Sequence, residues 1–238
     1  MTSRCILIVL LSVFVAAMGC SSALSAGLLN GMTEFAENDF KESMEKLSKS
    51  NWICSKYYLG KMYYYGLGVR KDSDVGIKRM TESAELGCNE SMVELADIYI
   101  ENKKYAEGIQ LLNQAVKNGS VKAASFLGSL FYSGNVVKKD YKNAVDLFSY
   151  AAINNDPVAQ YMLYSCYFNG RGVKKSLRLA RCWLKIAGDN NSPEAVYTLA
   201  VFYEKGLLVK KNKNKSIEMY KKAAYLGVKE AKAWIGKR

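Results

Sequence analysis

The sequence contains no histidine and only two prolines among its 238 residues. Without histidine, the chain cannot use an imidazole group for general acid–base catalysis or as a metal ligand, which excludes many enzyme mechanisms. It also has no closely spaced cysteine pair for zinc, no phosphate-binding loop and no dinucleotide fingerprint. These absences favour a binding or structural role over catalysis, and they predict neither a cofactor nor a metal ion.

Long apolar runs are equally scarce, and the most pronounced one lies at the N-terminus. Residues 6–18 (ILIVLLSVFVAAM) are preceded by Arg4 and followed by the small residues of 19–26. A transmembrane helix needs about 20 apolar residues, so this shorter run is typical of a secretory signal peptide. We expect residues 1–23 to act as a signal peptide, with cleavage near 23–26.

A second processing route is visible in residues 17–20 (AMGC), which resemble the cleavage box of bacterial lipoproteins. In that family Cys20 would be lipidated, and the serine after it would imply the outer membrane. Ala17 departs from the pattern, since leucine is typical at its position. The sequence therefore predicts export but leaves open the periplasm, the outer membrane as a lipoprotein, and secretion.

The charge is strongly one-sided, because 34 basic residues outnumber 22 acidic ones and give a formal net charge of +12. This excess suits an anionic partner such as phospholipid headgroups, a polyanionic glycan or an acidic protein. A solvated basic surface is the alternative interpretation. Nucleic acid is a poor candidate partner, because an exported protein seldom meets it and no recognised nucleic-acid-binding motif occurs.

The strongest signal is an internal repeat. A leucine recurs at intervals of 36, 32, 36 and 36 residues, at Leu59, Leu95, Leu127, Leu163 and Leu199. An aromatic residue follows four positions later, at Tyr63, Tyr99, Phe131, Tyr167 and Tyr203. Two columns of small residues keep the same steps, namely Ser83, Ala115, Ala151, Ala187 and Ala223, and Ser91, Ala123, Ala159, Ala195 and Ala231. Four columns with one period predict stacked structural units.

Each unit is expected to be two helices joined by a glycine turn. Apolar and small residues fall three and four apart in the first segment, which forms one helical face. A Gly-x-Gly sequence or a degraded form of it then ends the helix, because glycine adopts backbone angles closed to other residues. The second helix ends at Gly87, Gly119, Asn155, Asn191 or Gly227. The 32-residue unit lacks Gly-x-Gly, so we expect a shorter loop there with both helices intact.

This pattern, LGxxYxxGxGVxKD followed by AxxxxxxAAxxG, resembles the Sel-one-like repeat family, relatives of the tetratricopeptide repeats. The resemblance implies an all-α, right-handed superhelical solenoid with a non-catalytic role in binding partner proteins. About five repeats are expected, at 55–91, 92–123, 124–159, 160–195 and 196–231. Residues 27–54 would form a degenerate N-terminal helical cap, and residues 232–238 a C-terminal helical stub.

Pairs of basic residues recur at the predicted turns, at Arg70 and Lys71, Lys138 and Lys139, Lys174 and Lys175, and Lys210 and Lys211. Equivalent positions in stacked units lie along one edge, so these pairs predict a basic ridge that contacts an anionic membrane surface, glycan or acidic protein. A solvated turn is the alternative. Residues 204–238 add to the signal, with eleven basic and three acidic side chains.

A second candidate surface consists of the aromatic residues Tyr64, Tyr132 and Phe168, which share one column of the repeat. Tyrosine combines a large contact area with a polar tip, so such a column suits a groove that binds a protein partner. Packing between repeats is the alternative interpretation.

Four cysteines outside the N-terminal segment allow a geometric prediction. Cys54 and Cys88 are equidistant from one predicted turn, and Cys166 and Cys182 are equidistant from another. Residues equidistant from the turn of an antiparallel hairpin lie at similar heights, so each pair is a candidate disulfide in an exported protein. The alternative is four small buried hydrophobic residues.

Three functions remain open at this point. The first is an exported scaffold that binds another protein at a cell envelope or host surface, and the second is a basic adhesin that binds anionic lipid or glycan. The third is a β-lactamase-like hydrolase, because Ser43 and Lys46 have the Ser-x-x-Lys spacing of penicillin-recognising enzymes. No Lys-Thr-Gly or Ser-Asp-Asn sequence accompanies them. We therefore expect no enzymatic activity and no turnover of nitrocefin.

Overall fold

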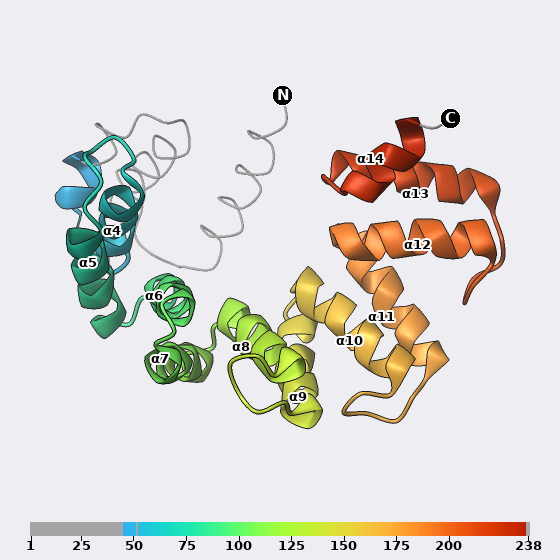
Figure 1. Ribbon diagram of the computed structural model, residues 1–238, viewed down its shortest axis with the longest axis horizontal. Helices are drawn as coiled ribbons and strands as arrows, with labels where there is room; N and C mark the ends of the chain where they lie inside the picture. The colour runs from blue at the N-terminus through green and yellow to red at the C-terminus, as the bar shows by residue number, and fades with distance from the viewer. Residues whose placement is uncertain (1–44, 51, 237–238) are drawn as a thin grey trace. The chain divides into compact units, whose positions relative to one another are not determined.

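The computed structural model describes residues 45–50 and 52–236, and all regular structure in these ranges is helical. The predicted signal peptide, Cys20, Ser43 and most of the predicted N-terminal cap lie outside the described residues. Within the described ranges, no helix is long and apolar enough to cross a membrane. The chain forms two compact units that divide between Lys103 and Lys104. They are called unit 1 and unit 2 below and run from blue to green and from green to red in Figure 1.

Unit 1 contains a helical hairpin and the helix that follows it. These are α4 (Ser55–Tyr65), α5 (Ser73–Glu85) and α6 (Asn89–Glu101), preceded by a helical turn at 45–48. Helix α5 packs along α4 and also contacts α6. The Ser83 hydroxyl donates to the Ile53 carbonyl at 3.0 Å, which joins the end of α5 to the start of α4 and shows that the two helices are antiparallel. Leu47 from the helical turn is buried with Leu59 and Met62.

Unit 2 is a series of helices in which each packs against the next. They are α7 (Tyr105–Lys117), α8 (Val121–Ser133), α9 (Tyr141–Ile153), α10 (Pro157–Asn169), α11 (Leu177–Asp189), α12 (Pro193–Lys205), α13 (Lys213–Tyr225) and α14 (Lys229–Gly236). The pairs α8–α9, α10–α11 and α12–α13 are hairpins, and successive hairpins stack through α9 against α10 and α11 against α12. At a rise of 1.5 Å per residue, a 13-residue helix is about 20 Å long.

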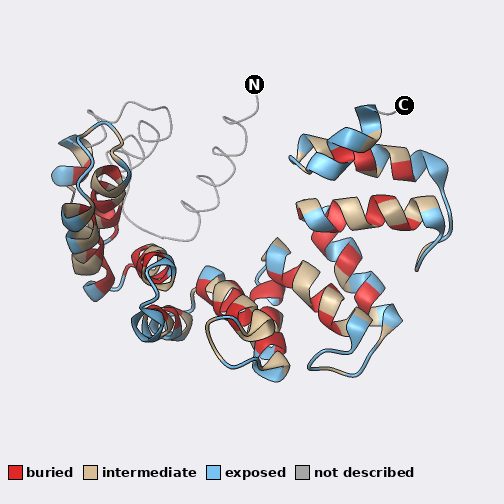
Figure 2. Cartoon of the chain, viewed as in Figure 1, coloured by how far each residue is buried: buried red, intermediate tan, exposed pale blue. Residues whose placement is uncertain are grey.

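The leucine column and the two small-residue columns form the buried core of these hairpins, whereas the aromatic column is half-buried. All five column leucines are buried, and the ten residues of the two small-residue columns have no exposed surface. The buried residues form stripes along the helices in Figure 2. Side chains larger than alanine or serine would separate the helices at these positions, which explains why the columns share the period of the repeat.

The turns also form where the sequence predicts them. The first helix of a hairpin ends at Gly66, Gly134, Gly170 or Gly206, each with a left-handed φ between 72° and 76°. The second helices end at the predicted glycine and asparagine residues, all with positive φ. Each long turn is closed by a backbone hydrogen bond to the carbonyl of the aromatic column, as from Asp140 to Phe131 at 3.0 Å. The short unit keeps both helices, α6 and α7, and its loop spans only residues 102–104.

Side-chain volume is balanced between the two helices of each hairpin. The residue after the column leucine is small in most units and packs against a large residue of the second helix, as in Gly60 with Met80 and Gly128 with Phe148. A Cβ atom added at Gly128 would lie 2.9 Å from the Phe148 ring. In the hairpin α10–α11 the order is reversed, and Tyr164 packs in one cluster with the smaller Leu184. This balance explains why a tyrosine is tolerated in an otherwise small column.

Candidate interaction surface

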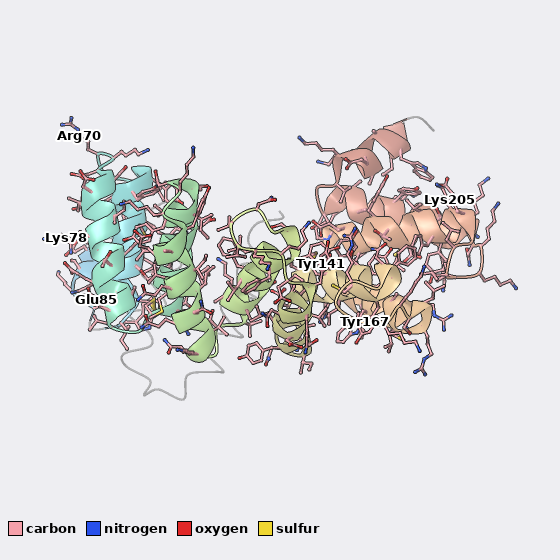
Figure 3. The ribbon with its side chains drawn as sticks, turned by 60° about the horizontal axis from the view of Figure 1, so that its bottom comes forward. Arg70, Lys78, Glu85, Tyr141, Tyr167 and Lys205 are labelled. Atoms are coloured by element: carbon pink, nitrogen blue, oxygen red, sulfur yellow. A yellow bond between two sulfur atoms is a disulfide. The ribbon has the colours of Figure 1, made fainter. Side chains whose placement is uncertain are left out.

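The predicted basic pairs lie on the long turns between the two helices of a hairpin, and all eight side chains are exposed. Figure 3 shows Arg70 projecting from the α4–α5 turn. Arg70 and Lys71 belong to unit 1, whereas the three lysine pairs belong to unit 2. The basic edge of unit 2 comprises three successive turns, at 134–140, 170–176 and 206–212.

The two lysines of a pair have different surroundings. The Cβ atom of the second lysine lies against the left-handed glycine that ends the first helix. A Cβ atom added to Gly170 would lie 3.3 Å from the Cβ of Lys175. A Cβ atom added to Gly206 would likewise lie 3.3 Å from the Cβ of Lys211. The stem of the second lysine thus covers the turn. The atoms nearest to a Cβ added at these glycines all belong to the second lysine, so the first lysine is the better candidate for binding a partner.

The residue after each pair caps the second helix through its side chain. Asp140 accepts from two backbone N–H groups of α9, Ser176 accepts from Leu179 N, and Asn212 accepts from Lys215 N. A cap needs an acceptor oxygen but not a negative charge. The two C-terminal turns therefore keep their helix caps but lack the carboxylate that Asp140 supplies in the α8–α9 turn.

The capping role of Asn212 gives a direct prediction. Asn212→Ala is expected to lower the free energy of unfolding by about 1 kcal/mol, because an N–H group at the start of α13 loses its acceptor. Asn212→Asp should preserve stability, since aspartate supplies the same oxygen. Urea unfolding followed by circular dichroism measures the difference. Asn214→Ala changes an exposed asparagine within α13 and serves as the control; an equal loss of stability in both alanine variants would contradict the capping role.

The predicted aromatic column is occupied largely by structural contacts. Tyr64 lies in unit 1, where its Cβ packs against Gly76, whereas Tyr132 and Phe168 belong to unit 2. In unit 2 the Phe168 ring lies 5.7 Å from Tyr164 and 6.4 Å from Phe202. All three side chains are half-buried. Their contacts favour packing between helices over a continuous aromatic groove.

Tyr132 is the centre of a contact between successive hairpins. The guanidinium of Arg171, from the α10–α11 turn, donates a hydrogen bond to the Tyr132 hydroxyl at 2.5 Å. Its Cζ atom lies 5.4 Å from the centroid of the Tyr132 ring and 5.7 Å from the centroid of the Tyr141 ring. Next to it, a Cβ added to Gly172 would collide with the Tyr141 backbone. Gly172, the second glycine of Gly-x-Gly, therefore allows the α10–α11 turn to contact the preceding hairpin. The hydrogen bond from Arg171 to Tyr132 stabilises this contact.

Hydroxyl groups link the first helices of successive hairpins in unit 2. The Tyr132 hydroxyl on α8 lies 3.0 Å from Ser165 Oγ on α10, and the Tyr161 hydroxyl on α10 lies 3.4 Å from Thr198 Oγ1 on α12. These side chains are half-buried, as is Val201 of α12. We call these five residues the first-helix face. It is a mixed polar and apolar surface in which hydroxyl contacts hold Tyr132 against Ser165 and Tyr161 against Thr198.

Unit 1 contains a cluster around Glu94 that the sequence analysis missed. The Glu94 carboxylate of α6 accepts from the hydroxyls of Tyr57 and Tyr65 at 3.3 and 2.9 Å and lies 3.5 Å from Lys61 Nζ. The three α4 residues are spaced four apart, which places them on one helical face. That spacing is the signal from which the cluster could have been predicted. Burial, followed by the Glu94 charge, raises the pKa of Tyr57 far above its usual range.

Alkaline pH should weaken this cluster. Burial and the hydrogen bond to Glu94 raise the pKa of Tyr65 to about 12. Because the folded chain holds this proton more tightly than the unfolded chain, the stability from Tyr65 is complete below about pH 10 and is lost as the pH rises from about 10 to 12. Tyr65→Phe should reduce this loss in urea unfolding measured across that range. Tyr225→Phe, a change of an exposed tyrosine in unit 2, should not; equal effects of both changes would contradict the prediction.

The first predicted disulfide is confirmed. Cys54 and Cys88 are bonded, with Cα atoms 5.4 Å apart, and the bond is visible in Figure 3. Cys54 precedes α4 and Cys88 precedes α6 at the position where Ser120, Asp156 and Ser192 cap their helices; neither cysteine side chain caps a helix. Glu90 Oε2 lies within 3.5 Å of both sulfurs, but bonded cysteines are not available as metal ligands.

The second predicted disulfide is wrong, because Cys166 and Cys182 are free. Cys166 is buried in the cluster formed with α9, where burial raises its pKa to about 11. Cys182 is exposed on α11, between the buried residues Ala180 and Leu184 in sequence. Two positions along a helix correspond to about 200°, so Cys182 lies on the opposite side of α11 from the residues that face α10.

A family model described as the Sel1 repeat matches residues 55–88, 121–156, 157–192 and 193–228, which together exceed half of the chain. The chain belongs to the Sel1 repeat family. Sel1 repeat proteins are generally non-catalytic scaffolds for protein interactions. No curated protein sequence matches the chain.

Several solved structures share this fold. One from Oxalobacter formigenes aligns with a TM-score of 0.77 and 24% identity over 85% of each chain. The c5321 protein, a protective antigen of uropathogenic Escherichia coli, aligns with a TM-score of 0.69 and 26% identity over 80% of this chain and 42% of its own. The immunity protein Pa5087 from Pseudomonas aeruginosa aligns with a TM-score of 0.56 and 16% identity over 77% of this chain and 73% of its own.

Proposed function

We propose that this Sel1 repeat protein is an exported scaffold that binds a protein partner at a cell envelope or host surface, through the first-helix face of unit 2. The observation that carries the binding role is the pair of hydroxyl contacts that joins α8, α10 and α12 into one surface. Tyrosine supplies large contact area at low entropic cost, and side chains already fixed by one another lose little freedom on binding.

Export is supported by the Cys54–Cys88 disulfide. Structural disulfides form and persist in oxidising compartments such as the periplasm and the extracellular space, and they are rare in the reducing cytosol. The predicted signal peptide agrees with this destination. Cleavage near 23–26 and lipidation of Cys20 are separate predictions, which intact mass measurement of the mature protein would distinguish.

Site-specific photo-crosslinking tests the binding face. A photoreactive residue at Ser165 or Val201 is expected to give a discrete adduct with an envelope protein in cells that express the full chain. Asp146 and Glu218, which are exposed on the second helices α9 and α13, provide matched control positions. Adducts of the same protein from all four positions, or from the control positions alone, would contradict the assignment of the face.

A competing variant adds a second test. Ser165→Arg places a long charged side chain in the middle of the first-helix face, next to Tyr132. We expect this change to abolish the adduct formed from Val201 while leaving the helical circular dichroism spectrum unchanged. An unchanged adduct would show that the partner does not occupy this face.

A further inference from the structure

The two C-terminal long turns of unit 2 form a surface with its own chemistry. They contribute Lys174, Lys175 and Leu177 from the α10–α11 hairpin and Leu207, Lys210 and Lys211 from the α12–α13 hairpin, all of them exposed. We call these six residues the C-terminal basic edge. The two turns are neighbours, because Leu208 and Val209 of the second turn pack into the same cluster as Tyr167 and Phe168 at the end of α10.

Positive charge at this edge exceeds the nearby negative charge in the sequence, although Glu204 and Glu218 flank the second basic stretch. Residues 157–188 contain six basic side chains and no acidic one, and residues 205–217 contain five basic side chains and no acidic one. The caps of both second helices are neutral, unlike Asp140 in the preceding turn. The edge is therefore suited to a surface that carries many negative charges.

The exposed leucines distinguish this edge from an ordinary solvated turn. Leu177 and Leu207 are 47% and 49% exposed, and each lies within four residues of a lysine pair. In the α8–α9 hairpin the equivalent residues are Tyr141, which Arg171 and Gly172 cover, and the polar Asn135. Exposed leucine side chains are thus presented beside the lysines at the two more basic of the three turns.

This combination favours lipid over a protein or glycan partner. The energetically important residues of protein interfaces are mostly tryptophan, tyrosine and arginine, and lysine is depleted there. Aliphatic side chains would gain little from a polyanionic glycan. Lysines that contact headgroups beside aliphatic side chains that enter the acyl boundary are typical of proteins that lie on anionic membranes.

We propose that the C-terminal basic edge docks this protein onto an anionic phospholipid surface. The lysines contact the headgroups, and Leu177 and Leu207 insert between them. The edge is formed by the turns, whereas the first-helix face runs along α8, α10 and α12, so docking of the edge leaves that face accessible to a protein. The inference does not depend on the proposed protein partner and is tested separately.

Vesicle co-sedimentation of the full chain tests the proposal. We expect binding to vesicles of equal parts phosphatidylglycerol and phosphatidylcholine, with weaker binding as salt shortens the Debye length from about 30 Å to about 8 Å. Vesicles of phosphatidylcholine alone carry no net charge, so binding to them measures any insertion of the apolar residues 6–18 into the membrane. Lys174→Glu with Lys210→Glu should weaken the phosphatidylglycerol-dependent binding by about thirtyfold or more, since each surface lysine contributes about fivefold.

Two matched variants separate this edge from general charge attraction. Lys117→Glu with Lys122→Glu makes the same charge change at exposed residues near the opposite ends of the helices, and it should weaken binding less than threefold. Leu177→Ser with Leu207→Ser leaves the charge unchanged and should still weaken vesicle binding several-fold, without altering binding to soluble polyglutamate. Circular dichroism of each variant verifies that the helices are intact.

Several outcomes would overturn the proposal. They are no phosphatidylglycerol-dependent binding at low salt, an equal effect of the two lysine double variants, and unchanged vesicle binding after both leucines are replaced. The last result together with tight polyglutamate binding would identify an acidic protein as the partner of this edge. The Lys174→Glu and Lys210→Glu double variant can also be tested for the Val201 photo-adduct. If it loses vesicle binding but keeps this adduct, the result would support two independent binding surfaces.

Discussion

Cys54→Ser combined with Cys88→Ala is expected to lower the stability of the α4–α5 hairpin by about 3–4 kcal/mol. The disulfide spans 34 residues in sequence and joins the start of α4 to the residue that follows α5 and precedes α6. The disulfide lowers the conformational entropy of the unfolded chain by closing this loop, so its removal raises that entropy and stabilises the unfolded state. Hydrogen exchange at the amides of α4 and α5 measures this local stability directly.

Two controls make the disulfide prediction sharper. Cys54→Ser combined with Cys88→Ser should be about 1 kcal/mol more stable than the variant with alanine, because serine at position 88 can cap α6 as Ser120 and Ser192 cap α8 and α12. Cys182→Ser removes an exposed free thiol and should leave exchange unchanged. Equal exchange in α4 and α5 before and after removal of the disulfide would refute its stabilising role.

Gly128→Tyr is expected to destabilise the α8–α9 hairpin by at least about 3 kcal/mol. A Cβ at this position would lie 2.9 Å from the Phe148 ring, and Phe148 is completely buried. Overpacking of a filled core forces side chains out of their rotamers or moves the helices apart. Urea unfolding with circular dichroism measures the loss.

The volume balance predicts that a second change rescues the first. Phe148→Leu alone should cost about 1–2 kcal/mol, because it leaves a cavity. Together, Gly128→Tyr and Phe148→Leu reproduce the pairing of Tyr164 with Leu184 in the next hairpin. The double variant should therefore be more stable than Gly128→Tyr alone, with a favourable coupling of about 1–2 kcal/mol. Strict additivity of the two costs would contradict the balance.

The helices, turns and core columns could be predicted because each depends on a local residue preference repeated at a fixed period. Glycine and asparagine mark the positive-φ ends of helices, and small residues mark the closest helix contacts. The family resemblance derived from this pattern is confirmed by the matched Sel1 repeats. Where one unit departs from the pattern, as in the loop at 102–104, both helices still form.

The two disulfide predictions show where position along the chain is insufficient. Equal distance from a turn places two residues at the same height, but it does not determine the direction in which they point. Cys54 and Cys88 lie just outside their helices at the open end of the hairpin, where their sulfurs meet. Cys166 and Cys182 lie within helices, and the rotation of each helix directs the side chains away from one another.

The candidate surface was harder to predict, because it depends on contacts between hairpins. The sequence shows doubled lysines, but only the structure shows that the second lysine of a pair covers the turn glycine. Likewise, the sequence places Tyr132 in an aromatic column, whereas its environment is set by Arg171 from the following hairpin. Residues 39 positions apart in sequence determine this contact. The periodicity of a single repeat contains no information about it.

Position within a stacked hairpin decides whether a side chain is bonded, buried or exposed. Differential alkylation of the folded, non-reduced protein followed by peptide mass spectrometry tests it most directly. We predict a linked pair of Cys54 and Cys88, rapid labelling of Cys182, and labelling of Cys166 only after unfolding. A bond between Cys166 and Cys182, or rapid labelling of Cys54 or Cys166 in the folded protein, would contradict the account.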